Sequence, residues 1–225
     1  MKIRPHEKFA PETLLAMAQE ERDQFFFVST HMAAWVAEDL FPHYLSVTVL
    51  RDPVERTISH LKQIAELPGS PLDLEEIYED PVWHSRLVNY QVQVFAASRP
   101  ENLAQEPDRH ACDPSRHPDP ERTRVLAEVR AAFATAIGIP KLIDERSYAE
   151  AAARLDRVDE VGVTERLGEL ADRLRARLGR ELGPLRRDRM SKRCSAVSAA
   201  LRQRIERENE WDQTLYERAL ARQTG

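Results

Sequence analysis

Five residues near position 51 have the types and the spacing of an anion-binding corner between a strand and a helix. Arg51 follows an apolar run rich in β-branched residues, and Asp52 and Pro53 can serve as an N-cap and a first helical residue. Glu55 completes a capping-box spacing, so the start of the helix is fixed. Free N–H groups in the first turn favour an anion, and Arg51 adds a planar guanidinium. Ser59 returns to nearly the same face two turns later. A phosphate could therefore bridge Arg51 and Ser59, although strand-Asp-Pro-helix junctions also occur without any ligand.

A strand over 46–50 and a helix over 53–65 must meet to form this corner. Apolar periodicity predicts further helices over 11–22, 31–40, 73–78, 82–97, 125–137 and 148–155, and further strands over 25–28 and 158–163. A leucine stripe from Leu167 to Leu182 is expected to pack in the core. So is a last helix that carries Val197, Leu201, Ile205, Leu215 and Ala219. The fold class is therefore α/β, with a small, mostly parallel sheet flanked by many helices.

A proline-rich, polar stretch over 99–121 interrupts this pattern. Because five prolines cannot propagate regular structure, we expect a mobile surface loop or a lid there. His110, Cys112, Asp113 and His117 lie in this stretch, but their spacing matches no established zinc site, and we expect no metal.

Composition favours a globular protein of one domain spanning 1–225. The 225 residues are 42% hydrophobic, which is enough to bury a sizeable core. A net charge of −5, from 33 basic and 38 acidic residues, gives no indication of nucleic acid or an anionic membrane as a partner. Two separated cysteines, Cys112 and Cys194, favour a reducing compartment. The chain shows no signal-peptide core and no apolar run of about 18 residues, so we expect a cytoplasmic protein without a membrane span.

The string Val-Leu-Arg-Asp-Pro-Val-Glu-Arg-Thr-Ile-Ser-His, which ends at His60, closely resembles a segment of the sulfotransferase superfamily. The likeness is strongest to the carbohydrate O-sulfotransferase and bacterial branches. That segment grips the 3′-phosphate of 3′-phosphoadenosine 5′-phosphosulfate (PAPS). The resemblance implies that Arg51 and Ser59 hold the 3′-phosphate of PAPS, or of the product 3′-phosphoadenosine 5′-phosphate (PAP).

Four further segments resemble the same family in the same order. They are Phe27-Val-Ser-Thr-His31, Asn89-Tyr-Gln91, Val161-Gly-Val-Thr-Glu-Arg166, and the closing segment with Asn209, Asp212, Leu215 and Tyr216. The resemblance thus covers the chain from about residue 27 to the end and implies a nucleotide-kinase-like α/β fold. Asn89 and Gln91 are expected to brace the nucleotide cleft through backbone hydrogen bonds.

The resemblance implies transfer of a sulfonyl group from PAPS to a hydroxyl of a carbohydrate or small metabolite. This reaction needs a base, and His31 is the candidate because its pKa suits proton transfer near neutral pH. A histidine at a strand-to-helix junction can instead merely cap backbone groups. His60 is expected on the helix surface, and Trp83 in the core.

The most basic stretch, over 185–193, precedes the last helix. A solvated charged loop is the simplest interpretation. The family uses a basic loop at this place to cover the adenosine and the 3′-phosphate, which implies cofactor-binding roles for Arg189, Ser191 and Lys192.

One departure from the family pattern limits the expected activity. Family members begin with a strand and a Lys-x-Gly-Gly-Thr loop that cradles the 5′-phosphosulfate, whereas the first glycine here is Gly69. Three alternatives follow. The chain is an N-terminally truncated or mis-started enzyme, a catalytically inactive relative that binds PAP, or a helical interaction module that kept only the fold.

Overall fold

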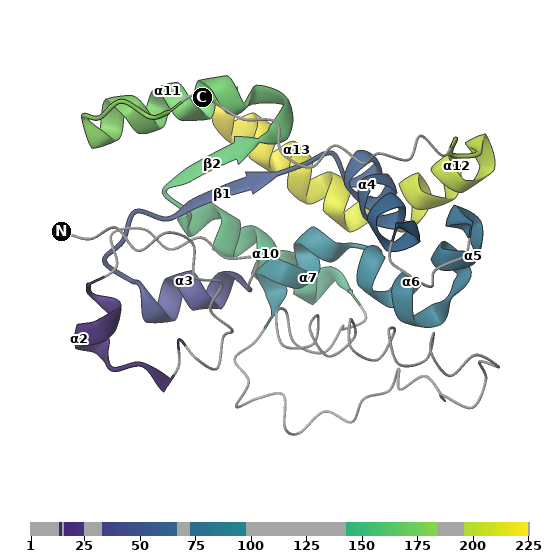
Figure 1. The fold of residues 1–225 in the computed structure, drawn as a ribbon, viewed down its shortest axis with the longest axis horizontal. Helices are drawn as coiled ribbons and strands as arrows, with labels where there is room; N and C mark the ends of the chain where they lie inside the picture. Colours follow the sequence, from purple (N-terminus) through teal and green to yellow (C-terminus); the bar gives the residue numbers. More distant parts are fainter. Residues whose placement is uncertain are drawn as a thin grey trace.

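The computed structural model describes residue 14 and residues 16–24, 33–66, 73–97, 143–183 and 196–224. The elements in chain order are α2 (Gln19–Arg22), α3 (Ala34–Leu40), β1 (Val47–Leu50), α4 (Pro53–Ala65), α5 (Leu74–Glu79), α6 (Pro81–Leu87), α7 (Tyr90–Ala96), α10 (Glu145–Arg157), β2 (Glu160–Val163), a 3-10 turn (Thr164–Arg166), α11 (Leu167–Leu178), α12 (Ala199–Glu208) and α13 (Glu210–Thr224). This part of the chain is mostly helical around a small parallel sheet, as Figure 1 shows. The general α/β class is confirmed. Among the described helices, none is long and apolar enough to cross a bilayer.

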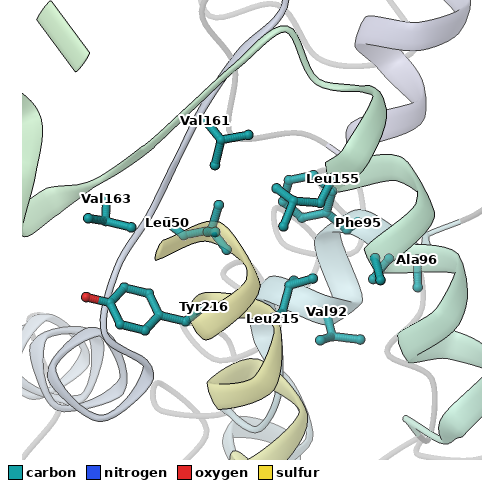
Figure 2. Close-up of a cluster of buried hydrophobic side chains, with 12 residues drawn as sticks. Leu50, Val92, Phe95, Ala96, Leu155, Val161, Val163, Leu215 and Tyr216 are labelled. Atoms are coloured by element: carbon teal, nitrogen blue, oxygen red, sulfur yellow. The ribbon is translucent and has the colours of Figure 1, made fainter. Parts of the chain in front are cut away.

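Strands β1 and β2 pair in parallel, with Val47 opposite Glu160 and Leu50 opposite Val163. Because side chains alternate along a strand, Leu50 and Val163 point to one face, where α7, α10 and α13 pack. Figure 2 shows this cluster, in which the side chains of the three helices meet those of both strands. The opposite face of β2 is covered by α11.

Two further groups of buried side chains lie at the ends of the sheet. At the carboxyl end, α4, α5, α6 and α12 share a cluster that includes Leu61, Ile77, Leu87 and Ile205. At the amino end, α3 contributes Trp35, Val36 and Leu40 to a third cluster. The β1–α4 corner therefore lies between the sheet and a helical layer (Figure 1).

Helix α4 begins and ends as the sequence predicts. The Asp52 carboxylate accepts a hydrogen bond from the Glu55 backbone N–H at 2.9 Å, and Pro53 occupies the first helical position. Strands β1 and β2 confirm the predicted strands, although each starts one or two residues later. Helix α10 is longer than predicted because the Asp144 side chain caps it by accepting from the Ser147 N–H.

Two predicted helices are each divided in the structure. The segment 82–97 contains α6 and α7, separated at Asn89, whose φ of 50° is left-handed. The predicted last helix is divided into α12 and α13 at Asn209. No proline or glycine marks either break in the sequence, so the apolar pattern was interpreted as one continuous helix in each case.

The prediction that the whole leucine stripe is core is wrong at its far end. Leu170 is 4% exposed, but Leu178 is 46% exposed. Twelve helical residues span roughly 18 Å, whereas four strand residues span roughly 13 Å, so the end of α11 extends past the sheet. The predicted strand over 25–28, the predicted helix over 125–137 and the proline-rich stretch lie outside the described residues. Of the predicted helix over 11–22, the structure describes residue 14 and residues 16–22, and α2 occupies only Gln19–Arg22.

Candidate anion-binding site

Arg51 leaves the carboxyl end of β1 with its backbone held by the side chain of Gln91. The Arg51 N–H donates to Gln91 Oε1 at 2.9 Å, and Gln91 Nε2 donates to the Arg51 carbonyl at 3.0 Å. Within the described residues, neither the Arg51 guanidinium nor the Ser59 hydroxyl has a hydrogen bond or ion pair. Both side chains are half-buried. The two groups predicted to bind a phosphate therefore lie on the same strand–helix corner, without a partner in the described part of the chain.

Gln91 is itself held by a buried network that reaches the C-terminal helix. The Asp212 carboxylate accepts from the backbone N–H groups of Gln91 at 3.0 Å and of Val92 at 2.7 Å. The Asp212 N–H donates to Asn89 Oδ1, and the Asn89 N–H donates to Asn209 Oδ1 at 2.8 Å. Asp212 is 0% exposed, and desolvation raises the pKa of its carboxyl despite these bonds. The predicted backbone hydrogen bonds of Asn89 and Gln91 are thus present.

Arg56 is a second guanidinium at this corner, and the sequence analysis did not single it out. Its Cζ lies 3.6 Å from the centre of the Tyr90 ring, and its Nη1 donates to the Leu87 carbonyl at 3.2 Å. Desolvation lowers the pKa of Arg56 to about 10, although Tyr90 and Asp212 act to raise it. The positive charge of Arg51 lowers it further.

His60 is packed against this cluster, which corrects the expectation that it lies on the helix surface. Its Nδ1 is 3.3 Å from Nη2 of Arg56, and its ring meets Tyr90 edge-on. Desolvation, followed by the charge of Arg56, lowers the pKa of His60 to about 3. The imidazole is therefore neutral at pH 7 and can accept a hydrogen bond from Arg56.

The end of β2 joins the same corner through Glu165. The Tyr216 hydroxyl donates to Glu165 at 2.9 Å, and the Thr164 hydroxyl donates to it at 2.8 Å. The pKa of Glu165 is lowered because these bonds, together with the Asp52 backbone N–H, outweigh desolvation. Residues from four of the resembling segments, at 49–60, 89–91, 161–166 and 205–216, therefore meet at the carboxyl end of the sheet.

The remaining predicted site residues cannot be placed. His31, Arg189, Ser191 and Lys192 lie outside the described residues, as do the histidines and cysteine of the proline-rich stretch. Trp83 is buried at 3% exposure, as predicted. The described residues contain no group of three or more potential metal ligands.

A cavity of about 510 Å³ lies at the other end of the strands, between α3, β1 and α10. Its charged groups already have partners, because Glu38 lies between the guanidiniums of Arg154 and Arg157, and Asp159 is bound by Ser46 and Arg177. Arg154 also donates to the Phe95 and Ala97 carbonyls at the end of α7. Ligands of open α/β sheets bind at the carboxyl ends of the strands. We therefore place the candidate site at Arg51 and not in this cavity.

Comparison with known proteins gave no match: no family model fits the chain, and no curated protein or solved structure is significantly similar to it.

Proposed function

We propose that Arg51 and Ser59 bind the 3′-phosphate of a phosphoadenosine nucleotide, and that the protein is a sulfotransferase-like protein. The observation that carries this proposal is the Arg51 guanidinium, which has no hydrogen bond or ion pair within the described residues and whose backbone is fixed at the strand exit by Gln91. An exposed arginine on a protein surface moves freely, whereas the Arg51 backbone is held from both sides. A guanidinium carried by a fixed backbone beside a capped helix start suits a phosphate.

In the proposed reaction, PAPS supplies the sulfonyl group and a hydroxyl of a carbohydrate or small metabolite accepts it. His31 would take the hydroxyl proton, and Arg189, Ser191 and Lys192 would cover the nucleotide. Cys112 and Cys194, which we expect to be free thiols, are compatible with action in the cytoplasm.

Two observations each favour an alternative function. The corner at Arg51 needs no other segment to hold a phosphate, which favours a protein that binds PAP without transferring sulfate. Val47 and Val49 on β1 are each 43% exposed, which favours an interaction module that docks a partner on the sheet.

Isothermal titration calorimetry with PAP tests the shared part of the first two candidates. We expect PAP to bind, adenosine 5′-monophosphate to bind much more weakly, and Arg51→Ala to weaken PAP binding by roughly 1.5–3 kcal/mol. Ser59→Ala should have a smaller effect in the same direction. Arg218→Ala is the matched control, since Arg218 pairs with Asp156 on the surface of α13. Equal binding of both nucleotides, or no binding of PAP, would reject the proposal.

A transfer assay with radiolabelled PAPS and a panel of sugar and phenol acceptors then separates the first two candidates. Label in any acceptor supports the enzyme. Tight PAP binding without label in any acceptor supports the inactive relative.

A further inference from the structure

The backbone that carries Arg51 is held by a side chain from another helix. Gln91 accepts from the Arg51 N–H at 2.9 Å and donates to the Arg51 carbonyl at 3.0 Å. Arg51 directly precedes Asp52, which is the N-cap of α4. These two hydrogen bonds therefore place both the base of the Arg51 side chain and the start of α4 relative to the sheet.

The Gln91 amide is in turn held by Asp212 of α13. The Asp212 carboxylate accepts from the Gln91 N–H at 3.0 Å and from the Val92 N–H at 2.7 Å, so it fixes the first turn of α7. Desolvation raises the pKa of Asp212, and the donors that oppose this rise include the side-chain NH₂ of Gln91. That contact orients the amide, because it leaves the amide oxygen to face the Arg51 N–H. Both side chains are buried.

Charge alone does not select an anion at this corner. The carboxylates of Asp52 and Glu165 lie there beside Arg51. Each carboxylate already accepts a hydrogen bond, from the Glu55 N–H and from the Tyr216 hydroxyl respectively. An anion must therefore be bound by directed donors, namely the Arg51 guanidinium and the start of α4. Hydrogen bonds weaken steeply when their geometry changes, so the affinity depends on where this backbone is held.

We propose that Gln91 and Asp212 are positioning residues of the phosphate site, through which α13 sets the affinity of the Arg51 corner for a 3′-phosphate. This inference rests on the proposed function, because it assumes that Arg51 binds that phosphate. Asp212 fixes Gln91, Gln91 fixes the Arg51 backbone, and neither side chain needs to touch the nucleotide. Loss of either one should weaken the contribution of the 3′-phosphate and leave the binding of the rest of the nucleotide nearly unchanged.

The ratio between the affinities for two nucleotides measures that contribution. PAP and adenosine 5′-monophosphate differ only in the 3′-phosphate. We expect Gln91→Leu to reduce the wild-type preference for PAP by about three- to tenfold in calorimetric titrations. Asp212→Asn should reduce the preference in the same direction. The double variant should show little further reduction, because both changes act through the same amide.

The ratio also separates a misplaced Arg51 from a damaged fold. Unfolded protein binds neither nucleotide, so partial unfolding weakens both affinities alike. Leu170→Ala is the matched control, since it removes a buried side chain that packs on Gly162 and should destabilise the protein without changing the ratio. A Gln91→Leu ratio equal to that of the wild type and of Leu170→Ala would overturn the inference.

Gln91→Glu tests the same hydrogen bonds by pH, and it carries the test if circular dichroism shows that Gln91→Leu is unfolded. Burial and the charge of Asp212 should raise the pKa of the introduced carboxyl. At pH 5 it is protonated, so it can accept from the Arg51 N–H and donate to the Arg51 carbonyl, whereas at pH 8 it has no hydrogen to donate.

Each Gln91→Glu ratio is compared with the wild-type ratio at the same pH, so that titration of the phosphate itself cancels. We expect the preference for PAP to be within about twofold of the wild type at pH 5 and lower by about threefold or more at pH 8. Equal relative ratios at the two pH values would overturn the inference. A wild-type protein that does not prefer PAP would reject the proposed function and this inference with it, whereas a preference that no variant alters would reject only the inference.

Discussion

The side-chain amide of Gln91 makes both hydrogen bonds of the Arg51 backbone, as a neighbouring strand would. Its oxygen accepts from the Arg51 N–H at 2.9 Å and its nitrogen donates to the Arg51 carbonyl at 3.0 Å. Pairing between β1 and β2 ends at Leu50 and Val163, one residue earlier. Gln91 therefore extends the hydrogen bonding of β1 by one residue and fixes the direction in which Arg51 leaves the sheet.

Replacing Gln91 by leucine should destabilise the fold. Gln91→Leu leaves a donor and an acceptor of the Arg51 backbone without partners, which should cost roughly 2–4 kcal/mol in the free energy of unfolding. Urea denaturation measures the loss. Gln213→Leu is the control, since the Gln213 side chain bonds Glu217 on the surface of α13, and a change below about 0.5 kcal/mol is expected there. Equal losses in the two variants would show that the Gln91 amide does not stabilise the corner.

The local half of this corner could be predicted from sequence. The cap residue Asp52, the first helical residue Pro53 and the position of Glu55 fix where α4 begins, because each acts on backbone groups within one turn. Asp73 similarly caps α5 in a full capping box with Glu76. Signals of this kind depend only on neighbours along the chain, so the sequence contains them.

The other half depends on contacts between residues about 120 positions apart. At the two helix breaks, the Asn89 N–H donates to Asn209 Oδ1 and the Asn89 side-chain amide donates to the Glu208 carbonyl, and neither break follows from apolar spacing. The position of Arg56 over Tyr90 likewise depends on the packing of α4 against α7 and α13. The resemblance singled out the segments around Asn89 and Asp212, but it gave no reason for Arg56 to be buried.

Replacing Asp212 by asparagine should destabilise the protein even though it removes a buried charge. One oxygen becomes an NH₂ group that faces a backbone N–H of α7, and Arg56 loses its buried counter-charge. We expect Asp212→Asn to reduce the free energy of unfolding by roughly 2–4 kcal/mol in urea denaturation.

Asp156→Asn is the matched control for Asp212. Asp156 pairs with Arg218 at the surface, where ion pairs contribute little, so a loss below about 1 kcal/mol is expected. If Asp212→Asn proved as stable as the wild type, the carboxylate would not be needed at the start of α7.

Stability should depend on pH through the bond between Tyr216 and Glu165. The pKa of Glu165 is lowered in the folded state, so its contribution is present above its unfolded pKa of about 4.3 and is lost as pH falls through the folded value. Desolvation and Glu165 raise the pKa of Tyr216 to about 12, so the hydroxyl still donates at neutral pH. Tyr216→Phe should therefore lose about 1 kcal/mol at pH 7 and much less at pH 3.

Urea denaturation of both proteins at pH 7 and pH 3 measures this difference. Tyr148→Phe is the control, because the Tyr148 hydroxyl makes no hydrogen bond with the described part of the chain. Its effect should be small and equal at the two pH values. A Tyr216→Phe loss that does not change with pH would show that the hydroxyl does not act through the ionised Glu165.

Gly162 allows α11 to pack closely on β2, and a methyl group there should force the helix away. A Cβ at Gly162 would lie 2.5 Å from Cδ2 of Leu170, which is closer than carbon atoms approach one another, and 3.2 Å from its Cγ, which is tighter than most Cβ contacts. Gly162→Ala should therefore cost roughly 1–3 kcal/mol by overpacking. Most of that cost should disappear in a Leu170→Ala background, so the two changes should be strongly non-additive in a double-mutant cycle.

Gly168→Ala is the control, since a Cβ there meets no atom within 4 Å and removing a helical glycine should stabilise α11. Additive losses at Gly162 and Leu170 would mean that a methyl group at position 162 does not clash with the Leu170 side chain.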